Sequence, residues 1–266
     1  MRLVIHENYE KASRWAASYI AGRINAYKCS PENPFVLGLP TGGSPRLIYR
    51  EFIKMVQEKK LSFANVHTFN MDEYIGLPGD HPQSYRRFMM ENLFDHVDIN
   101  LANVFIPDGM AKDPAEECRL YEEAITKSGG VELFLGGMGI DGHLAFNVPG
   151  SSLQSRTRIK TLNEETRNAN ARFFDGDITK VPFKSLTVGV GTVMDAREVV
   201  IIVSGRNKAR ALAAIVEGGV NHMWTLSCLQ MHPKAIIVCD EDAIDELKVG
   251  TVKYFKDIER ENIQSY

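Results

Sequence analysis

Short apolar runs of strand length, separated by stretches with helical periodicity, constrain the fold of this chain most strongly. Each run is nearly continuous in apolar residues and is bounded by Gly, Pro or a polar cluster. Because a strand with one wet face would alternate polar and apolar residues, such runs predict a mostly parallel sheet with both faces covered. The runs are PFVLGLP near residue 35, NVHTFNMD near 66, VELFLGG near 131, LTVGVG near 186, EVVIIVSG near 198 and KAIIVCD near 234.

The segments between the runs carry apolar residues at the spacing of amphipathic helices. One segment has Asp113 as a candidate N-cap directly before Pro114, which suits a first helical turn. No repeat, low-complexity run or linker divides the chain, so we predict one α/β domain over residues 1–266, with helices on both faces of the sheet. The predicted helices span residues 9–26, 45–58, 113–127, 206–217 and 241–258.

Composition and charge exclude several classes of protein. The 266 residues carry a formal net charge of −3, which argues against binding to nucleic acid through bulk charge. No stretch approaches the roughly 20 apolar residues of a membrane helix, and the first residues lack the apolar core of a signal peptide. The widely spaced cysteines, without a CxxC pair or zinc spacing, predict reduced thiols, no metal site and a cytoplasmic protein. They are Cys29, Cys118, Cys228 and Cys239, of which the last two are expected in the core.

Ligands of a parallel α/β sheet bind beyond the carboxyl ends of the strands, so the residues that follow each run are the candidates for chemistry. Thr41, Gly42, Gly43, Ser44 and Pro45 follow the first run and lead into a predicted helix. The glycines allow the backbone to approach a ligand, and free N–H groups at a helix N-terminus attract anions such as phosphate. The alternative is a plain strand-to-helix turn capped by Ser44. No Lys follows the glycines, so the turn is not a Walker A loop.

Two further strand ends carry titratable residues. Asp72 follows the second run, where it could act as a base or could cap a turn or a helix. Asp141 and His143 follow the third run on a glycine-flanked loop, and a carboxylate so close to the imidazole would orient it for acid/base work. Together with an anion-binding turn, these residues predict proton transfer on a small phosphorylated metabolite.

The same loop has the glycine spacing of a dinucleotide-binding fingerprint. Gly137, Gly139 and Gly142 match it, with Glu164 and Glu165 downstream. The residues that follow, HLAFNVPGSS, do not have the pattern of the helix that such a fingerprint opens. This difference argues against NAD binding.

Residues 140–185 are the least regular part of the chain. A long irregular stretch is either functional, as a lid or a binding loop, or a meander of short helices. It contains basic residues that could clamp phosphate or could form a solvated face. They are Arg156, Arg158, Lys160, Arg167 and Arg172, and Lys208 opens a helix after the run near 198.

Taken in order, several motifs resemble those of the glucosamine-6-phosphate deaminase family, from Met1 to about Tyr254. The resemblance implies a Rossmann-like sheet and an enzyme of amino-sugar catabolism. Such an enzyme isomerises and deaminates D-glucosamine 6-phosphate, with water, to D-fructose 6-phosphate and ammonia, and it uses no metal or organic cofactor. The motifs are LGLPTGGSP, VHTFNMDEYIGLP, HPQSYRRFM, GGMGIDGHLAFN, SRTRIKTL, LTVGVGT and GVNHMW.

The resemblance gives each candidate residue a role. Asp72 matches the base that moves a proton between C2 and C1 of the opened sugar through a cis-enolamine. His143 matches the acid/base that opens the pyranose ring between O5 and O1, and Asp141 matches the carboxylate that orients it. The residues that match the phosphate cradle are Thr41, Gly42, Gly43, Ser44, Arg172 and Lys208.

The sequence departs from the family pattern at one catalytic position. After AFN the family has a Glu that completes the carboxylate–His relay for ring opening, whereas this chain has Val148. Valine can neither accept a proton nor polarise an imidazole, and a general acid/base group is worth about 10²–10⁴-fold in rate. We therefore expect slower ring opening rather than its loss, because sugar phosphates also open spontaneously.

A second set of residues resembles the family's allosteric site, at which N-acetyl-D-glucosamine 6-phosphate activates a bacterial hexamer. This resemblance implies a second phosphate site at a subunit interface, and it implies that residues 162–182 form a mobile lid over the active site. The matching residues are Ser151, Arg158, Lys160, Thr161, Tyr254 and Met1.

Three functions remain open from the sequence. The first is a deaminase that is slowed at ring opening. The second is a non-catalytic sensor of amino-sugar phosphates, which only Val148 supports, and the third is an NAD-linked dehydrogenase, which only the glycine spacing supports. The presence of Asp72, Asp141 and His143 favours the enzyme over the sensor.

Overall fold

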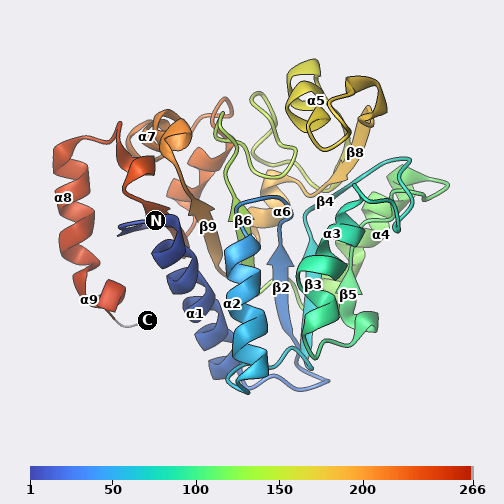
Figure 1. Ribbon diagram of the computed structural model, residues 1–266, viewed down its shortest axis with the longest axis horizontal. Helices are drawn as coiled ribbons and strands as arrows, with labels where there is room; N and C mark the ends of the chain where they lie inside the picture. The colour runs from blue at the N-terminus through green and yellow to red at the C-terminus, as the bar shows by residue number, and fades with distance from the viewer. Residues whose placement is uncertain (265–266) are drawn as a thin grey trace.

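The main sheet of the computed structural model, which describes residues 1–264, has seven parallel strands (Figure 1). Five of the predicted apolar runs form strands of this sheet, which confirms the predicted fold class. The N-terminal edge strand and the short strand at the other edge are not among the predicted runs. In order across the sheet, the strands are β1 (Arg2–His6), β10 (Ala235–Asp240), β9 (Val199–Val203), β6 (Leu133–Gly137), β2 (Phe35–Leu39), β3 (Val66–Asn70) and β5 (Val104–Phe105).

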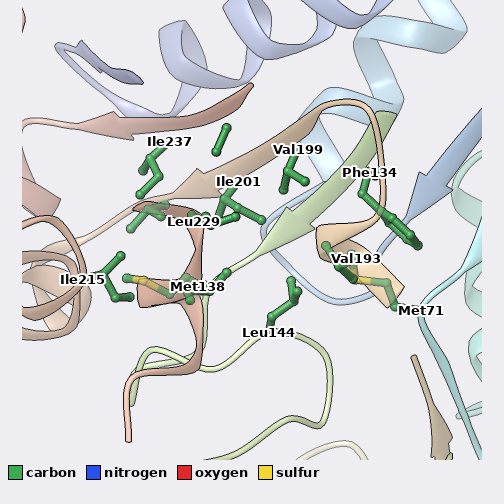
Figure 2. Packing of buried hydrophobic residues seen from close by; sticks show 14 of the residues in the cluster. Met71, Phe134, Met138, Leu144, Val193, Val199, Ile201, Ile215, Leu229 and Ile237 are labelled. Carbon is green, nitrogen blue, oxygen red and sulfur yellow. The ribbon is translucent and has the colours of Figure 1, made fainter. Parts of the chain in front are cut away.

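Helices cover both faces of the main sheet, as the sequence predicts. Because successive strand residues point to opposite faces, each strand supplies both hydrophobic clusters, one of which Figure 2 shows. The helices on one face are α1 (Tyr9–Tyr27), α2 (Arg46–Gln57) and α3 (Tyr85–Asn92). The helices on the other face are α4 (Pro114–Lys127), α6 (Val190–Met194), α7 (Ala209–Glu217) and α8 (Val249–Ile258), and α9 (Arg260–Gln264) follows α8.

The run near residue 186 forms part of a second sheet rather than of the main one. This antiparallel sheet has the order β4 (Asp72–Tyr74), β8 (Lys184–Thr187) and β7 (Arg158–Thr161). The central strand β8 is buried over most of its length, so it has the apolar pattern of a buried strand. Such a pattern reports burial but does not identify the pairing partner, which is why the sequence did not separate the two sheets.

The predicted helix over 241–258 is wrong in its first half. A 3₁₀ turn spans Asp242–Ile244, and α8 begins only at Val249, after an extended residue at Lys248. The backbone N–H of Lys248 donates a hydrogen bond to Glu217, 2.8 Å away, which anchors the chain directly before α8 begins. The other predicted helices are confirmed to within a few residues, and Asp113 caps α4 as predicted. Among the described residues, no helix combines the length and apolar character that crossing a bilayer requires.

The order of the strands places a ligand site at one edge of the sheet. From β2 the chain proceeds to β3 and β5 on one side, whereas from β6 it proceeds to β9 and β10 on the other. The point between β2 and β6 is therefore a topological switch point, where the connections leave a crevice outside the carboxyl ends of the strands. All of the candidate active-site turns in the sequence follow strands β2, β3, β6 and β9, the four central strands of this order.

Close packing across the switch point explains a glycine in β2. A Cβ atom added at Gly38 would lie 1.8 Å from the Cδ1 atom of Phe134 on β6. We predict that Gly38→Ala lowers the free energy of unfolding by about 1–3 kcal/mol, because the Phe134 ring must leave its rotamer or the strands must separate. Urea denaturation measures the change. Gly219→Ala is the control, since a Cβ atom there meets open space, and an equal effect of the two substitutions would contradict the packing argument.

Candidate active site

The turn after β2 lies at the carboxyl end of the sheet, next to the end of β6. Ser44 lies against the end of β6, because a Cβ atom at Gly137 would approach the Cβ of Ser44 to 3.4 Å. The hydroxyl of Tyr9 donates hydrogen bonds to the carbonyl oxygens of Gly43 and Ser44, at 3.2 and 2.8 Å, and holds the turn from the side of α1. Gly42 has a φ of +94°, a conformation that favours glycine.

The start of α2 decides between the two interpretations of this turn. The N-cap of α2 is Pro45, which makes no side-chain hydrogen bond, so the expectation that Ser44 caps the helix is wrong. The first N–H groups of α2 are therefore left without a side-chain cap. The space above Gly42 and Gly43 is open, since a Cβ atom on either would meet nothing within 4 Å. Together these features suit an anion better than a closed structural turn.

Asp72 stands beside this turn, at the start of β4. Leu39 pairs with Asn70 in the main sheet, so the chains of β2 and β3 reach the crevice side by side. The Asp72 side chain is only 6% exposed, and none of the described residues donates a hydrogen bond to its carboxyl group. Burial, followed by the charge of Glu73, raises the pKa of Asp72 to about 8. Asp72 caps neither a turn nor a helix, so the structural alternative for this residue is wrong.

The adjacent carboxylate, Glu73, has the opposite environment. It accepts hydrogen bonds from the backbone N–H groups of Tyr74, Tyr85 and Arg86, at 2.8 to 2.9 Å. Burial raises its pKa, but these donors partly offset that effect, as expected for a carboxylate at the N-terminus of α3. The role of Glu73 is not evident from the sequence, because it depends on the three-dimensional position of this side chain at the start of α3.

The loop after β6 brings Asp141 and His143 together as predicted. The Nδ1 atom of His143 and a carboxylate oxygen of Asp141 form a short hydrogen bond. Burial raises the pKa of Asp141, but the hydrogen bond and charge of His143 outweigh it, so the pKa lies below its ordinary value. Gly139 is required at this point, since a Cβ atom there would lie 2.3 Å from the His143 ring. The imidazole is thereby held in one orientation with its other nitrogen available.

Lys208, after β9, reaches the same loop from the other side. Its Nζ atom donates a hydrogen bond to the carbonyl oxygen of Met138. Burial lowers the pKa of Lys208, while the charge of Asp141 opposes that shift. The phosphate-binding candidates from β2 and β9 therefore flank the β6 loop that carries the imidazole, as the strand order implies.

Two other predicted site residues, Val148 and Arg172, lie in surroundings that differ from those of the residues described above. Val148 lies half-buried in the loop that follows His143, and this loop is anchored by hydrogen bonds of Asn147 to Val188 and Thr225. Arg172 ends the helix α5 (Glu164–Ala171), is exposed, and lies over the ring of Phe173, 4.7 Å from its centroid. Within the described residues, no hydrogen bond or ion pair joins Arg172 to the turn after β2.

The irregular stretch 140–185 contains β7, a short α-helix, a 3₁₀ turn over Ile178–Lys180, the start of β8 and a small hydrophobic cluster. The segment 162–182 holds its own apolar side chains against Tyr74 and Phe146, and Asn170 donates a hydrogen bond to the Tyr74 hydroxyl, 2.9 Å away. The stretch therefore contains a short helix, as the second alternative expects, and loops that pack against the body of the protein. No helix opens after Gly142, which removes the structural basis for dinucleotide binding.

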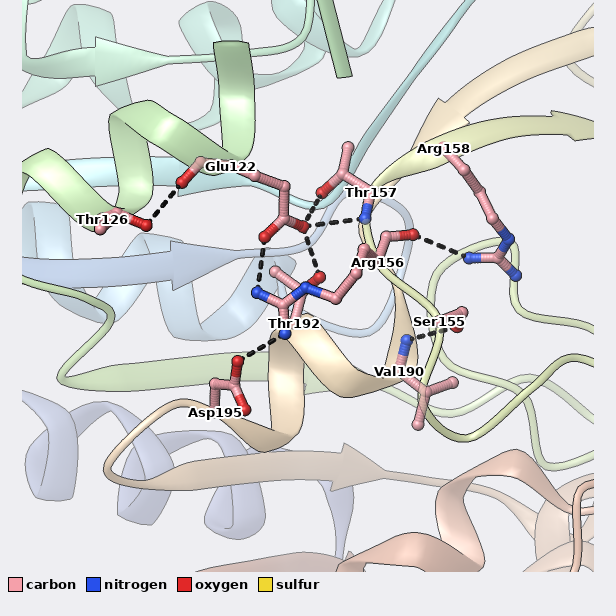
Figure 3. Close-up of polar contacts among 9 residues, drawn as sticks. All are labelled: Glu122, Thr126, Ser155, Arg156, Thr157, Arg158, Val190, Thr192 and Asp195. Carbon is pink, nitrogen blue, oxygen red and sulfur yellow. Dashed lines mark hydrogen bonds and ion pairs between the residues drawn. The ribbon is translucent and has the colours of Figure 1, made fainter. Parts of the chain in front are cut away.

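The basic residues of this stretch divide into two groups. Arg156 pairs with Glu122 and Asp195, and Glu122 also accepts hydrogen bonds from Thr157 and Thr192, which ties the start of β7 to α4 and α6 (Figure 3). These contacts identify Arg156 as structural. Arg167 is structural as well, because it donates to the carbonyls of Ile178 and Val181 and stacks on the ring of Phe183.

Arg158 and Lys160 form the second group. Lys160 donates a hydrogen bond to the hydroxyl of Ser151, 3.1 Å away, and neither cation forms an ion pair with any described carboxylate. Burial lowers the pKa of both, and the charge of Arg158 adds to the shift at Lys160. Two partly buried cations without a carboxylate partner suit an anion.

The other residues matched to the allosteric site are not part of this cluster. Thr161 ends β7 and is exposed. Tyr254 lies exposed on α8, at the other end of the long axis of the molecule from β8, the pairing partner of β7 (Figure 1). Met1 packs against the main hydrophobic core. One chain therefore brings Ser151, Arg158 and Lys160 together but leaves Tyr254 apart from them.

The cysteines and carboxylates offer no metal site within residues 1–264. The thiols of the described residues are all free, and Cys228 and Cys239 lie in the core as predicted.

Comparisons with known proteins agree with this geometry. A family model described as glucosamine-6-phosphate isomerases/6-phosphogluconolactonase matches residues 7–240. The glucosamine-6-phosphate deaminase of Phocaeicola vulgatus is 59% identical over 263 residues, which cover 99% of this chain and 100% of that protein. The deaminase of Yersinia enterocolitica is 58% identical over 265 residues and covers 100% of both.

Solved structures give the same result. A monomeric glucosamine-6-phosphate deaminase is 40% identical with a TM-score of 0.86, over 91% of this chain and 98% of that one. The 6-phosphogluconolactonase of Trypanosoma cruzi shares the fold, with a TM-score of 0.72 at 19% identity, over 93% of this chain and 97% of that one. This chain therefore belongs to the glucosamine-6-phosphate deaminase family.

Proposed function

We propose that this protein converts D-glucosamine 6-phosphate and water to D-fructose 6-phosphate and ammonia. The observation that carries the proposal is the Asp72 carboxyl group, which is buried beside an open anion-binding turn and receives no hydrogen bond from any described residue. A buried carboxyl group with a pKa of about 8 is a stronger base than an ordinary carboxylate. We infer the substrate from the family to which the chain belongs.

The first step is opening of the sugar ring. His143 takes the proton from O1 and returns one to O5, so that the C1–O5 bond breaks and an aldehyde forms at C1. Asp141 holds the imidazole in the orientation that this transfer needs. Val148 supplies no carboxylate to this step, and among the described residues Asp141 is the side chain that forms a hydrogen bond with His143.

The second step is proton transfer between the carbons. The Asp72 carboxylate removes the proton from C2 and delivers it to C1 through a cis-enolamine, which leaves an imine at C2 and a reduced C1. Water then adds to C2 and ammonia leaves, which gives the ketose. A cationic 2-amino group next to Asp72 favours the ionised carboxylate, so substrate binding itself would prepare the base.

The phosphate group holds C2 against Asp72. The backbone N–H groups from Thr41 to Ser44 and the ammonium of Lys208 flank the crevice on two sides. Arg172 reaches the phosphate only if residues 162–182 move over the crevice, so we propose that this segment is the lid of one catalytic domain spanning residues 1–266. No cofactor takes part in these steps, and we propose that the enzyme works in the cytoplasm.

A second candidate function rests on Val148 alone. A protein that had kept its phosphate sites while its relay lost a member would bind amino-sugar phosphates without turning them over. The ammonia assay below separates this sensor from the enzyme, because a sensor releases none.

Asp72→Asn tests the proposed function. We predict that ammonia release from glucosamine 6-phosphate falls by about 10²–10⁴-fold, because an amide cannot take the C2 proton. The folded-state pKa of Asp72 lies above its unfolded value, so its burial destabilises the protein increasingly as the pH rises from about 4 to about 8.

The same variant should therefore be more stable than the wild type at pH 8, by about 2–5 kcal/mol, and equally stable at pH 4. Thermal unfolding at the two pH values measures this difference. Unchanged ammonia release would refute the assignment of the base, and a variant that is less stable at pH 8 would refute the burial argument.

Val148→Glu tests the relay. We predict that it raises kcat by up to about 10²-fold with little change in KM, because a carboxylate is restored to the ring-opening step. Val148→Gln is the matched control, since it has nearly the same size but accepts no proton at neutral pH, and it should leave kcat near the wild-type value. Equal kcat values for the wild type and Val148→Glu would show that position 148 is dispensable.

We propose that Ser151, Arg158 and Lys160, joined by Thr161, form a second phosphate site in a homohexamer. N-acetyl-D-glucosamine 6-phosphate would bind there as activator, with Tyr254 and Met1 supplied across a subunit interface. The support is the pair of cations without a carboxylate partner, and the distance of α8 from them within one chain.

The kinetics test this second site. We predict sigmoidal dependence of the rate on glucosamine 6-phosphate that becomes hyperbolic with the activator, and loss of the activator's effect in Lys160→Ala. Hyperbolic curves without the activator would rule out the allosteric proposal, and sedimentation of a monomer would rule out the hexamer.

A further inference from the structure

The carboxyl group of Asp240 is a buried group that the mechanism above does not use. It ends β10 and is 4% exposed. It accepts hydrogen bonds from the backbone N–H of Gly205, at 3.0 and 3.2 Å, from the N–H of Ala243, at 3.0 Å, and from the hydroxyl of Ser204. None of the described Lys or Arg side chains pairs with it, so its charge is met by neutral donors alone.

Two of these donors, Ser204 and Gly205, lie in the turn that leads to Lys208. Ser204 directly follows β9, and Gly205 has a φ of +90°, where glycine is favoured. The N–H of Lys208 donates to the carbonyl of Gly205 at 3.0 Å and closes a 3₁₀ turn over Arg206–Lys208. Asp240 therefore fixes Gly205, to which the backbone of Lys208 is hydrogen-bonded.

The other end of the lysine is held as well. Its Nζ atom bonds to the Met138 carbonyl on the loop that carries Asp141 and His143. A long, flexible side chain is thus fixed at its backbone by Asp240 and at its tip by the catalytic loop. Because both ends of the side chain are fixed, the ammonium group is already in position when the phosphate binds. The side chain therefore loses less conformational entropy on binding.

A carboxylate suits this position better than an amide. Every partner of Asp240 is a donor, and both of its oxygens accept from Gly205. In an Asn side chain the N–H₂ group would replace Oδ2, face the Gly205 N–H that lies 3.2 Å from it, and force the Ser204 hydroxyl to accept instead of donate. We propose that Asp240 is a positioning residue for the substrate phosphate, which it serves through Lys208; this inference rests on the proposed function.

A double-mutant cycle with Asp240→Asn and Lys208→Ala tests the proposal. Binding of inorganic phosphate, measured by isothermal titration, is the first readout, and KM against kcat for glucosamine 6-phosphate is the second. We expect Asp240→Asn to weaken phosphate binding and to raise KM by about tenfold, with kcat changed less than about twofold. In the Lys208→Ala background it should change neither quantity.

The control is Glu198→Gln. Glu198 is another buried carboxylate and forms an ion pair with Arg23 at 2.7 Å. It directly precedes β9, so it lies at the opposite end of this strand from Ser204 and the turn that leads to Lys208. We expect Glu198→Gln to destabilise the folded protein without changing the binding of phosphate. Ser204→Ala, which removes one donor and keeps the carboxylate, should weaken phosphate binding by about threefold in the same Lys208-dependent way and serves if Asp240→Asn does not fold.

Equal effects of Asp240→Asn with and without Lys208 would overturn the proposal, as would a loss of kcat at constant KM or an absence of phosphate binding to the wild type. If the wild type binds phosphate but releases no ammonia, the proposed function fails while the phosphate measurements still decide the role of Asp240.

Discussion

The burial of the Asp72 carboxyl group without a hydrogen-bond donor is the constraint on which the rest of the site depends. Glu73, its neighbour in sequence, is also buried but accepts hydrogen bonds from three backbone N–H groups, two of them at the start of α3. This contrast separates a structural carboxylate from a reactive one. Burial of the Asp72 carboxyl group without a hydrogen-bond donor lowers the stability of the folded protein, and groups of this kind are concentrated at functional sites.

The topology explains why the other candidate groups follow strands that end at the same edge of the sheet as this carboxyl group. The strand order changes direction between β2 and β6, and the turns after β2, β3, β6 and β9 open into one crevice. Glycines at the crevice let the backbone and side chains approach, with Gly137 against Ser44 and Gly139 against His143. Buried hydrogen bonds at the ends of the strands, such as those of Asp240, then fix the loops that carry the charged groups.

Much of this arrangement could be predicted from the sequence, because periodicity reports burial and parallel strands bring their ends together. The turn at Thr41–Ser44 and the Asp141–His143 pair followed from that reasoning. The choice between base and cap for Asp72 could not, because it depends on which donors surround the carboxyl group in space. The second sheet and the break before α8 were missed for a similar reason, since pairing partners and backbone anchors such as Glu217 are distant in sequence. The roles proposed for Arg172 and Tyr254 require movement or a second subunit, which one sequence does not specify.

The central claim is that Asp72 is held protonated at neutral pH by its surroundings. Infrared difference spectroscopy of the wild type against Asp72→Asn, recorded over a pH series without substrate, measures this directly. The account predicts a carboxylic-acid C=O band that belongs to Asp72 and disappears with an apparent pKa of about 8. Disappearance of that band near pH 4, the ordinary range of an exposed aspartate, would contradict it.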